Sequence, residues 1–308
     1  MKLKKPKFWD NKEPNLFAII LYPISYLIQF LNSFKRKPTK NNFQIKTICF
    51  GNIYIGGTGK TSLCIKLSKL LKKRNIKSCF VKKFYDDQYD EQKLLKKNGK
   101  LFLSTKRIEA IKEAENQKYD IAILDDGLQD NSFKSDISIV CFNSDNWIGN
   151  GMSIPSGPLR ESVNSLKKYN QIFLNGNCEN LENIKNQIFK INPKANVYIG
   201  KYEPVNLKEF KKNDNYLAFS GIGNHDTFIS MLKNNGLNIL RDIEFPDHFQ
   251  YDVGDISKIT EEANNLNCKI ITTEKDYQRL GNLNINDIKF IKSEIRISDE
   301  EKFLELIL

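Results

Sequence analysis

A glycine-rich loop near residue 56 constrains the fold of this chain more than any other feature of its sequence. Residues 56–61 read Gly-Gly-Thr-Gly-Lys-Thr, after an apolar run at 45–52 and before residues 63–71, where apolar side chains recur at helical spacing. A strand, a glycine loop and a helix in this order close backbone N–H groups around phosphate oxygens, at a helix N-terminus whose dipole favours negative charge. The sequence therefore predicts a nucleotide site of the P-loop type.

The residue types of the loop suggest a role for each side chain. Lys60 would reach the β- and γ-phosphates, and Thr61 would ligate Mg²⁺. The loop departs from the strict G-x-x-x-x-G-K-[ST] pattern because Tyr54 stands where that pattern has its first glycine, and it resembles the G-G-x-G-K-T variant instead. The predicted nucleotide-binding residues are Gly56, Gly57, Thr58, Gly59, Lys60, Thr61 and Ser62.

Paired carboxylates follow a second apolar run. Residues 119–124 form a strand-like segment that leads into Asp125, Asp126 and Gly127. This is the Walker-B arrangement, in which a carboxylate stands at the carboxyl edge of a parallel sheet near Mg²⁺. A strand followed by an ordinary Asp-Gly turn is the alternative. Because the glycine loop occurs in the same chain, a metal-binding role is favoured for these carboxylates. The predicted metal ligands are Thr61, Asp125 and Asp126.

The order of strand and helix patterns indicates an α/β fold, and 308 residues suggest two domains of ordinary size. Strands are expected at 45–52, 78–81, 119–124, 137–142 and 171–174, and a helix at 107–115. They predict a P-loop NTPase-like core, with a doubly wound and mostly parallel sheet, over residues 41–205. Further strands at 216–220, 239–245, 269–273 and 289–291 predict a second, smaller α/β domain over 206–308.

The N-terminal arm, residues 1–40, carries most of the charge excess. The chain has a net charge of +11, and its first 46 residues hold ten Lys and Arg against Asp10 and Glu13. Residues 16–31 are apolar at helical spacing, but as a helix they would extend about 24 Å against a hydrocarbon core of about 30 Å. The basic flanks and the aromatic rings predict an amphipathic helix in an anionic membrane interface; the alternative is a core helix with solvated ends. These flanking residues are Lys2, Lys4, Lys5, Lys7, Lys35, Arg36, Lys37 and Lys40, with Trp9, Tyr22 and Tyr26.

The six cysteines show no C-x-x-C or Cys/His spacing, so a zinc site is not expected and a reducing compartment fits. The body beyond the arm is nearly neutral, which disfavours nucleic-acid binding.

Several short blocks in this order resemble the tetraacyldisaccharide 4′-kinase (lipid A 4′-kinase) family over nearly the full length of the chain. The blocks are the apolar N-terminal helix, Gly51-Asn52 with the loop at 56–61, Asp90-Glu91, Arg107-Ile108-Glu109-Ala110, Leu124-Asp125-Asp126-Gly127-Leu128-Gln129, Pro155-Ser156-Gly157-Pro158-Leu159-Arg160-Glu161, Gly221-Ile222-Gly223-Asn224, Phe245-Pro246-Asp247-His248 and Thr273-Glu274-Lys275-Asp276.

The resemblance implies an enzyme that moves the γ-phosphate of ATP to the 4′-hydroxyl of an acylated glucosamine disaccharide 1-phosphate, with Mg²⁺. It implies a peripheral or monotopic protein on the cytoplasmic face of the inner membrane, whose partners are that lipid and the anionic membrane surface, with no nucleic acid and no obligate protein partner. It also implies that Asp90 is the base, with His248 as its partner and Lys60 as a further catalytic residue.

Five more residues are implied to support the site: Glu91, Arg107, Gln129, Arg160 and Glu161. Arginine suits planar phosphate recognition, and the alternative for Arg107, Arg160 and Glu161 is a surface ion pair. His225 has no implied role and is expected at the surface.

Two departures from the family pattern stand out. Lys82-Lys83-Phe84-Tyr85-Asp86 replaces a usual Ser-Arg-Gly-Tyr-Gly segment, and Asp130 replaces a usual histidine. Lys83 keeps a positive charge but lacks the bidentate fork of arginine.

Two other functions remain open from sequence. One is a soluble P-loop NTPase of the G-G-x-G-K-T type that couples hydrolysis to delivery of a partner or a metal. The other is a relative that binds membrane and nucleotide without transfer, although nucleotide binding alone would not require Asp90 and His248.

Overall fold

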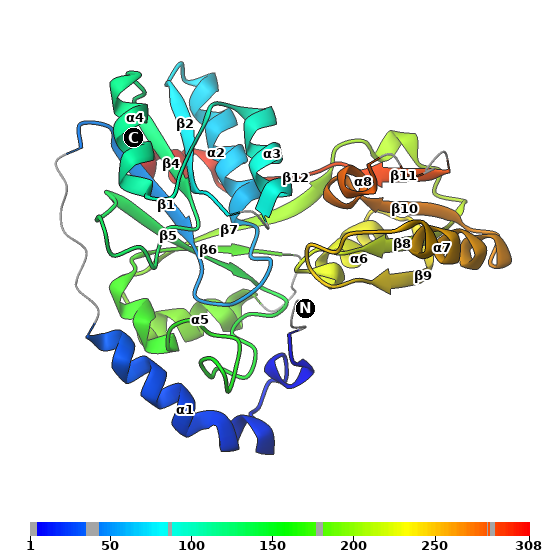
Figure 1. The fold of residues 1–308 in the computed structure, drawn as a ribbon, viewed down its shortest axis with the longest axis horizontal. Helices are drawn as coiled ribbons and strands as arrows, with labels where there is room; N and C mark the ends of the chain where they lie inside the picture. Colours follow the sequence, from blue (N-terminus) through cyan, green and yellow to red (C-terminus); the bar gives the residue numbers. More distant parts are fainter. Residues whose placement is uncertain (1–4, 35–42, 86–87, 177–180, 282, 284–286) are drawn as a thin grey trace. The chain divides into compact units, whose positions relative to one another are not determined.

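The computed structural model describes residues 5–34, 43–85, 88–176, 181–281, 283 and 287–308. The chain forms two compact units (Figure 1). Unit 1 comprises Met1–Asp86, Glu91–Gly200 and Ile297–Leu308, and unit 2 comprises Asp87–Asp90 and Lys201–Arg296. The predicted division into domains at 1–40, 41–205 and 206–308 stays a prediction.

The larger sheet contains eight strands within the described residues, in the order β12-β7-β6-β5-β1-β4-β2-β3. Each pairing from β7 through to β3 is parallel. The strands are β1 (Lys46–Gly51), β2 (Ser78–Lys83), β3 (Leu101–Ser104), β4 (Ile121–Asp125), β5 (Ile137–Asn143), β6 (Gln171–Asn175), β7 (Asn196–Pro204) and β12 (Ser293–Ile297). β1 lies between β4 and β5, so the carboxyl ends of β1 and β4 meet at one edge of the sheet.

Helices of unit 1 pack against this sheet. They are α1 (Leu16–Ser33), α2 (Lys60–Lys73), α3 (Tyr89–Asn98, beginning in unit 2), α4 (Arg107–Asn116), α5 (Leu181–Ile191) and α9 (Glu300–Ile307), with short 3-10 turns η1 (Lys7–Trp9) and η3 (Val163–Lys168). α4 packs Ala110, Ile111 and Ala114 against Cys49 of β1 and Val81 of β2. The central strands are almost wholly buried, which explains why they read as continuous apolar runs.

The strands expected at 45–52, 78–81, 119–124, 137–142 and 171–174 are confirmed as β1, β2, β4, β5 and β6. β3, β7 and β12 were not predicted. β3 and β12 stand at the two edges of the sheet, and β7 lies next to β12. Edge positions bury less side-chain surface, so these strands carry mixed polar and apolar residues that give no clear signal.

Unit 2 has a four-stranded parallel sheet in the order β11-β10-β8-β9. Its strands are β8 (Asn215–Ser220), β9 (Asn238–Glu244), β10 (Lys269–Thr273) and β11 (Ile288–Ile291), and its helices are α6 (His225–Asn234), α7 (Val253–Asn265) and α8 (Glu274–Leu280), with the 3-10 turn η4 (Leu207–Glu209). The four strands expected here are confirmed. α7 begins at a capping box in which Asp252 and Asp255 each accept from the other's backbone N–H.

The expected surface position of His225 is wrong. The side chain is 4% exposed; its Nδ1 lies 2.7 Å from Ser220 Oγ and its Nε2 lies 3.0 Å from Asp242 Oδ2. His225 opens α6, whose first turn carries the buried Thr227 and Phe228, so the ring is enclosed with its two nitrogens satisfied.

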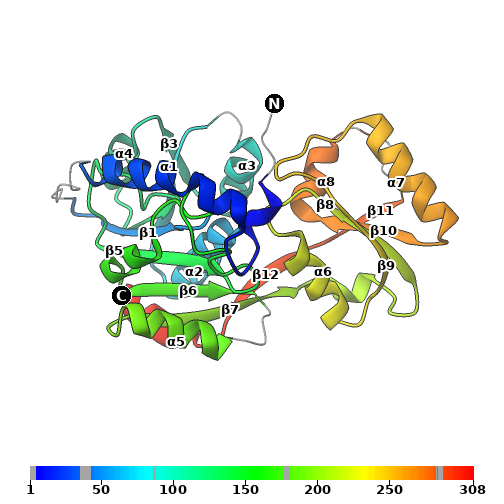
Figure 2. The ribbon, with the colours of Figure 1, turned by 90° about the horizontal axis from the view of Figure 1, so that it is seen from below.

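α1 lies along the outside of unit 1 (Figures 1 and 2). Polar groups attach this N-terminal region to the unit. Ser25 Oγ donates to Ser153 O at 2.8 Å and accepts from Ser156 N at 3.0 Å, while Trp9 Nε1 donates to Pro155 O at 3.1 Å. Large apolar side chains are more than a third exposed along the rest of the helix: Leu16, Phe17, Ile19, Ile20, Tyr22, Ile24, Tyr26, Leu27, Ile28, Phe30 and Leu31. A surface helix usually turns its apolar side chains toward the protein core, whereas α1 leaves most of its large apolar side chains exposed.

None of the helices in the described part of the chain has the length and apolar character needed to cross a membrane. The basic residues at 2–4 and 35–40 lie outside the described residues.

Candidate active site

The glycine loop joins the buried β1 to α2. Gly56 and Gly59 have φ values of 125° and 77°, in the left-handed region that favours glycine, and Gly59 is the residue from which α2 starts. Thr58 is buried; Asn175 Nδ2 at the end of β6 donates to its carbonyl oxygen at 2.5 Å. The structure thus places residues 56–62 at a helix N-terminus, the position that binds phosphate in nucleotide proteins. Gly57 in the loop and Ser62 in the first turn of α2 are both partly buried.

Thr61 and Asp125 are brought together at the carboxyl edge of the sheet. Thr61 Oγ1 donates to Asp125 Oδ2 at 3.0 Å. Lys82 Nζ, at the end of β2, donates to the same oxygen at 2.7 Å and to Glu91 Oε2 at 2.6 Å. Burial favours the neutral amine, but the two carboxylates outweigh it and hold the pKa of Lys82 above its usual value. Lys82 is therefore a buried cation beside the predicted metal ligand.

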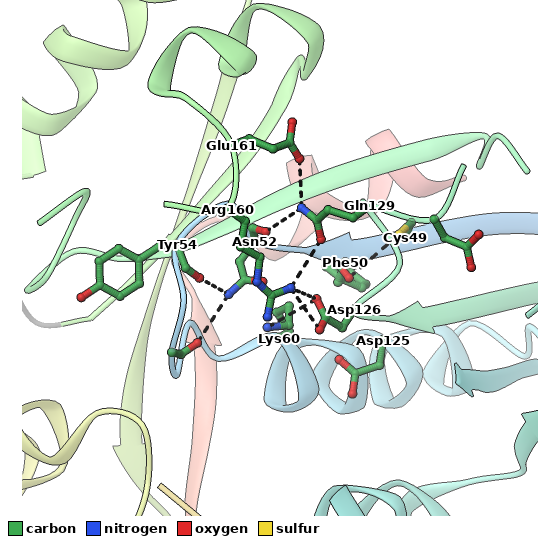
Figure 3. Close-up of polar contacts among 12 residues, drawn as sticks. Cys49, Phe50, Asn52, Tyr54, Lys60, Asp125, Asp126, Gln129, Arg160 and Glu161 are labelled. Atoms are coloured by element: carbon green, nitrogen blue, oxygen red, sulfur yellow. Dashed lines mark hydrogen bonds and ion pairs between the residues drawn. The ribbon is translucent and has the colours of Figure 1, made fainter. Parts of the chain in front are cut away.

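Asp126 meets the predicted phosphate-binding cations (Figure 3). Lys60 Nζ lies 3.8 Å from Asp126 Oδ1, and Arg160 Nη1 lies 3.2 Å from the same oxygen. Burial would raise the pKa of Asp126, but the charges of Lys60 and Arg160 lower it below its ordinary value. Its φ of 59° turns the chain sharply after β4, so that Asp125 and Asp126 face different partners.

Gln129 connects the supporting residues on the other side of Asp126. Its Nε2 donates to Asn52 O and to Glu161 Oε1, both at 3.0 Å, and its Oε1 accepts from Arg160 Nη1 at 3.4 Å. Figure 3 shows these side chains converging above the start of α2. The structure therefore brings Gln129, Arg160 and Glu161 together with Lys60 and Asp126.

Arg107 is buried rather than part of a surface ion pair. Its side chain is 6% exposed; Nη1 donates to Asp130 Oδ2 at 2.9 Å, and Nη2 donates to the carbonyl oxygen of Asp126. The aspartate that replaces the family histidine thus pairs with Arg107. A Cβ on Gly127 would stand 2.9 Å from Cys49 Sγ, so any other residue here would have to displace that side chain.

Asp90 and His248 lie together in unit 2. His248 Nδ1 is 3.1 Å from Asp90 Oδ1, and Arg279 Nη2 donates to Asp90 Oδ2 at 2.6 Å. Burial would raise the pKa of Asp90, but the hydrogen bonds from His248 and Arg279 and the charges of Lys275 and Arg279 hold it well below its usual range. Asp90 is therefore an anion in contact with an imidazole, the pair that proton transfer requires.

The oxygen atoms around Thr61 fit Mg²⁺. Asp125 Oδ1 is buried and finds no hydrogen-bond partner among the described residues, next to the Thr61 hydroxyl. Mg²⁺ is bound in nucleotide enzymes through one or two protein oxygens together with phosphate and water, so a larger cluster of ligands is not needed.

Two residues of the site were missed from sequence. Lys82 follows the apolar residues of β2, but only the fold shows that it is buried beside β4, the strand that ends in Asp125. Arg279 lies one helical turn beyond Asp276 of the block Thr273-Glu274-Lys275-Asp276, and only the fold shows that it reaches Asp90.

The glycine turn at the start of α2 and the buried Thr61–Asp125 pair define a phosphate-binding protein of the α/β class. The profile of the family described as Tetraacyldisaccharide-1-P 4′-kinase matches residues 17–308, and the chain belongs to this family. The tetraacyldisaccharide 4′-kinase of Pelagibacter ubique is 56% identical over 308 residues, covering 100% of this chain and 98% of the relative. That of Rickettsia canadensis is 37% identical over 330 aligned positions, covering 100% and 97%.

A solved structure supports the fold independently. The LpxK protein of Aquifex aeolicus, crystallised in complex with ATP, superposes with a TM-score of 0.67 at 22% identity, covering 95% of this chain and 98% of that chain. The predicted family, its kinase activity and its place in lipid A biosynthesis are confirmed.

Proposed function

We propose that this chain joins the γ-phosphate of ATP to the 4′-hydroxyl of a tetraacylated glucosamine disaccharide 1-phosphate, with the phosphate loop and the Asp90–His248 pair as its working parts. The observation that carries the proposal is the presence of both parts in one chain. A phosphate loop alone serves hydrolysis or binding, whereas an alcohol acceptor also has a proton to lose.

Nucleotide binding is assigned to unit 1. The loop amides of residues 56–62 and Lys60 would hold the β- and γ-phosphates. Asp126 keeps Lys60 and Arg160 close to each other, so two cations are ready where phosphate charge arrives. The ATP-bound relative from Aquifex aeolicus supports this choice of nucleotide. The fold would then be of the P-loop NTPase type.

The metal site is assigned to Thr61 and Asp125, with Asp126 beside them. A bound Mg²⁺ would neutralise phosphate charge there. Thr61 and Lys82 fix one oxygen of Asp125, and Oδ1 has no hydrogen-bond partner among the described residues, so it is the oxygen that we assign to the metal.

Proton removal is assigned to Asp90 and His248. The 4′-oxygen attacks the γ-phosphorus, a new O–P bond forms, and the bond from that phosphorus to the β-phosphate bridging oxygen breaks to release ADP. The proton of the hydroxyl passes to the Asp90–His248 pair, which returns it to water in the next cycle.

The test is transfer of ³²P from γ-labelled ATP in mixed micelles. Labelled disaccharide bisphosphate should appear only when the disaccharide 1-phosphate is present, and ADP release should match it. Equal ATP turnover with and without the lipid, without labelled lipid, would instead establish the soluble NTPase.

We propose that α1 places the protein on the cytoplasmic face of the inner membrane as a peripheral or monotopic enzyme. Its apolar side chains point away from unit 1, while its polar Ser25 faces the loop at 153–156. A helix with such a face lowers its free energy by entering the lipid interface, and the basic residues of the arm add attraction to anionic lipid.

Placing glutamate on the exposed face of α1 should weaken membrane binding. The double variant Ile20→Glu/Leu27→Glu should reduce the fraction that sediments with anionic vesicles by about tenfold, because each charge must be dehydrated at the interface. Leu240→Glu, at a similarly exposed residue of β9, is the control and should sediment like the wild type. Deletion of residues 1–34 should act like the double variant. Complete sedimentation of the truncated chain would contradict the assignment.

A further inference from the structure

A buried ion pair in α8 stands behind the Asp90–His248 pair. Asp276 is fully buried and accepts hydrogen bonds from Gly221 N at 3.0 Å, Tyr251 Oη at 3.0 Å and Thr273 Oγ1 at 2.6 Å. Arg279 Nη1 lies 3.0 Å from Asp276 Oδ1. A carboxylate with this many donors has a fixed orientation, so it anchors the guanidinium.

The two terminal nitrogens of Arg279 contact different groups. Nη1 is held by Asp276 and donates to the carbonyl oxygen of Gly221 at 2.6 Å, while Nη2 donates to Asp90 Oδ2 at 2.6 Å. The side chain is only 4% exposed. Because the guanidinium is planar and rigid, anchoring one nitrogen fixes the place of the other.

The same carbonyl also positions the histidine. His248 N donates to Gly221 O at 3.0 Å, and the residue has a φ of 58°, a left-handed conformation that the surrounding contacts must impose. A Cβ on Gly221 would lie 3.0 Å from Phe249 Cβ and 3.1 Å from Tyr251 Oη, so a larger residue would have to displace these neighbours. Asp90 thus has Oδ2 on Arg279 and Oδ1 on His248.

We propose that Arg279 is a positioning residue of the transfer reaction, whose guanidinium holds one carboxylate oxygen of Asp90 so that the other faces His248. This inference rests on the function proposed above. Arg279 lies outside the site residues predicted from sequence. Asp276, the last residue of the block Thr273-Glu274-Lys275-Asp276, anchors its guanidinium.

Several charged groups surround the Asp90–His248 pair. Asp90 also feels Lys275 and is followed by Glu91, and Asp247 Oδ1 lies 3.8 Å from His248 Nε2. Arg279 contacts both members of the pair, since its Nη2 lies 2.6 Å from Asp90 Oδ2 and 3.5 Å from His248 Nδ1. It keeps Asp90 ionised, so the imidazole is the group that carries the substrate proton.

Two substitutions separate this role from support of the fold. Arg279→Lys keeps a cation for Asp276 but cannot also reach Asp90, so kcat should fall about tenfold; Arg279→Gln removes the charge, and kcat should fall about a hundredfold. The KM for ATP should stay within about twofold, because nucleotide contacts are untouched. Arg241→Gln, an exposed arginine paired with Glu262 in the same unit, is the matched control and should keep full activity.

The pH dependence provides the second readout. Loss of a cation next to His248 favours its protonated form, so the acidic limb of kcat should move up by about one pH unit in Arg279→Gln. The NMR signal of the His248 ring, one of only two histidines, should show the same movement in the full-length protein. This signal tests Arg279 even if no phosphate transfer is found, which separates the two proposals.

Folded Arg279→Lys and Arg279→Gln proteins with unchanged kcat and unchanged His248 titration would overturn the inference. If Arg279→Gln does not fold because Asp276 is left without its cation, Arg279→Lys decides by the same measurements.

Discussion

Replacing Asp90 by asparagine is expected to lower kcat about a thousandfold, while the dissociation constant for ATP stays within about twofold of the wild type. Asparagine has the same shape but no negative charge, so it leaves Arg279 and the protonated form of His248 without their anion. Single-turnover transfer of ³²P at saturating lipid, with ATP binding measured by calorimetry, gives the two quantities.

Asp242→Asn is the matched control for this experiment. Asp242 also contacts a histidine, with Oδ2 at 3.0 Å from His225 Nε2, but it lies outside the proposed machinery. Its substitution should leave kcat within about twofold. A large loss of ATP affinity in Asp90→Asn would assign Asp90 to the metal instead of the proton.

Replacing Lys82 by methionine is expected to lower the free energy of unfolding by about 3–5 kcal/mol. Asp125 is 1% exposed and Lys82 2% exposed, so methionine would leave a carboxylate in the interior with only the hydroxyl of Thr61 as a described donor to its Oδ2. Urea denaturation of the full chain, followed by tryptophan fluorescence and circular dichroism, measures the loss.

Lys66→Met provides the comparison, since Lys66 pairs with Glu300 at 2.5 Å but both side chains are partly exposed. It should cost less than about 1 kcal/mol. The double variant Lys82→Met/Asp125→Asn should recover most of the loss of Lys82→Met, because the buried charge is removed with its partner. Equal losses for Lys82→Met and Lys66→Met would show that burial of the Lys82–Asp125 pair does not matter for stability.

The sequence predicted the central strands and the loop because the forces that form them act locally. β1, β4 and β5 are mostly buried and therefore mainly apolar, and Gly56 and Gly59 stand where φ is positive. The edge strand β3 has only four residues and partial burial, which leaves no periodic pattern to detect.

The sequence predicts the site residues that follow from residue type and position along the chain. It does not predict contacts between segments that are distant in sequence. Thr61 and Asp125 follow from the order of strand, loop and helix, because parallel strands end at one edge. The burial of Lys82 depends on β2 lying beside β4, and the contact of Arg279 with Asp90 joins residues 189 positions apart. The surface position predicted for His225 was wrong for the same reason, because burial of its ring depends on the packing of α6 and β9.

The outward apolar face of α1 also determines how the purified protein will behave in a test tube. Without a lipid surface, these side chains can leave water only by covering one another on separate molecules, and exposed patches of this kind drive association. Clusters that grow with concentration and dissolve in mild detergent follow from this. An apparent oligomer in plain buffer would therefore report this exposed apolar face and not a specific interface between subunits.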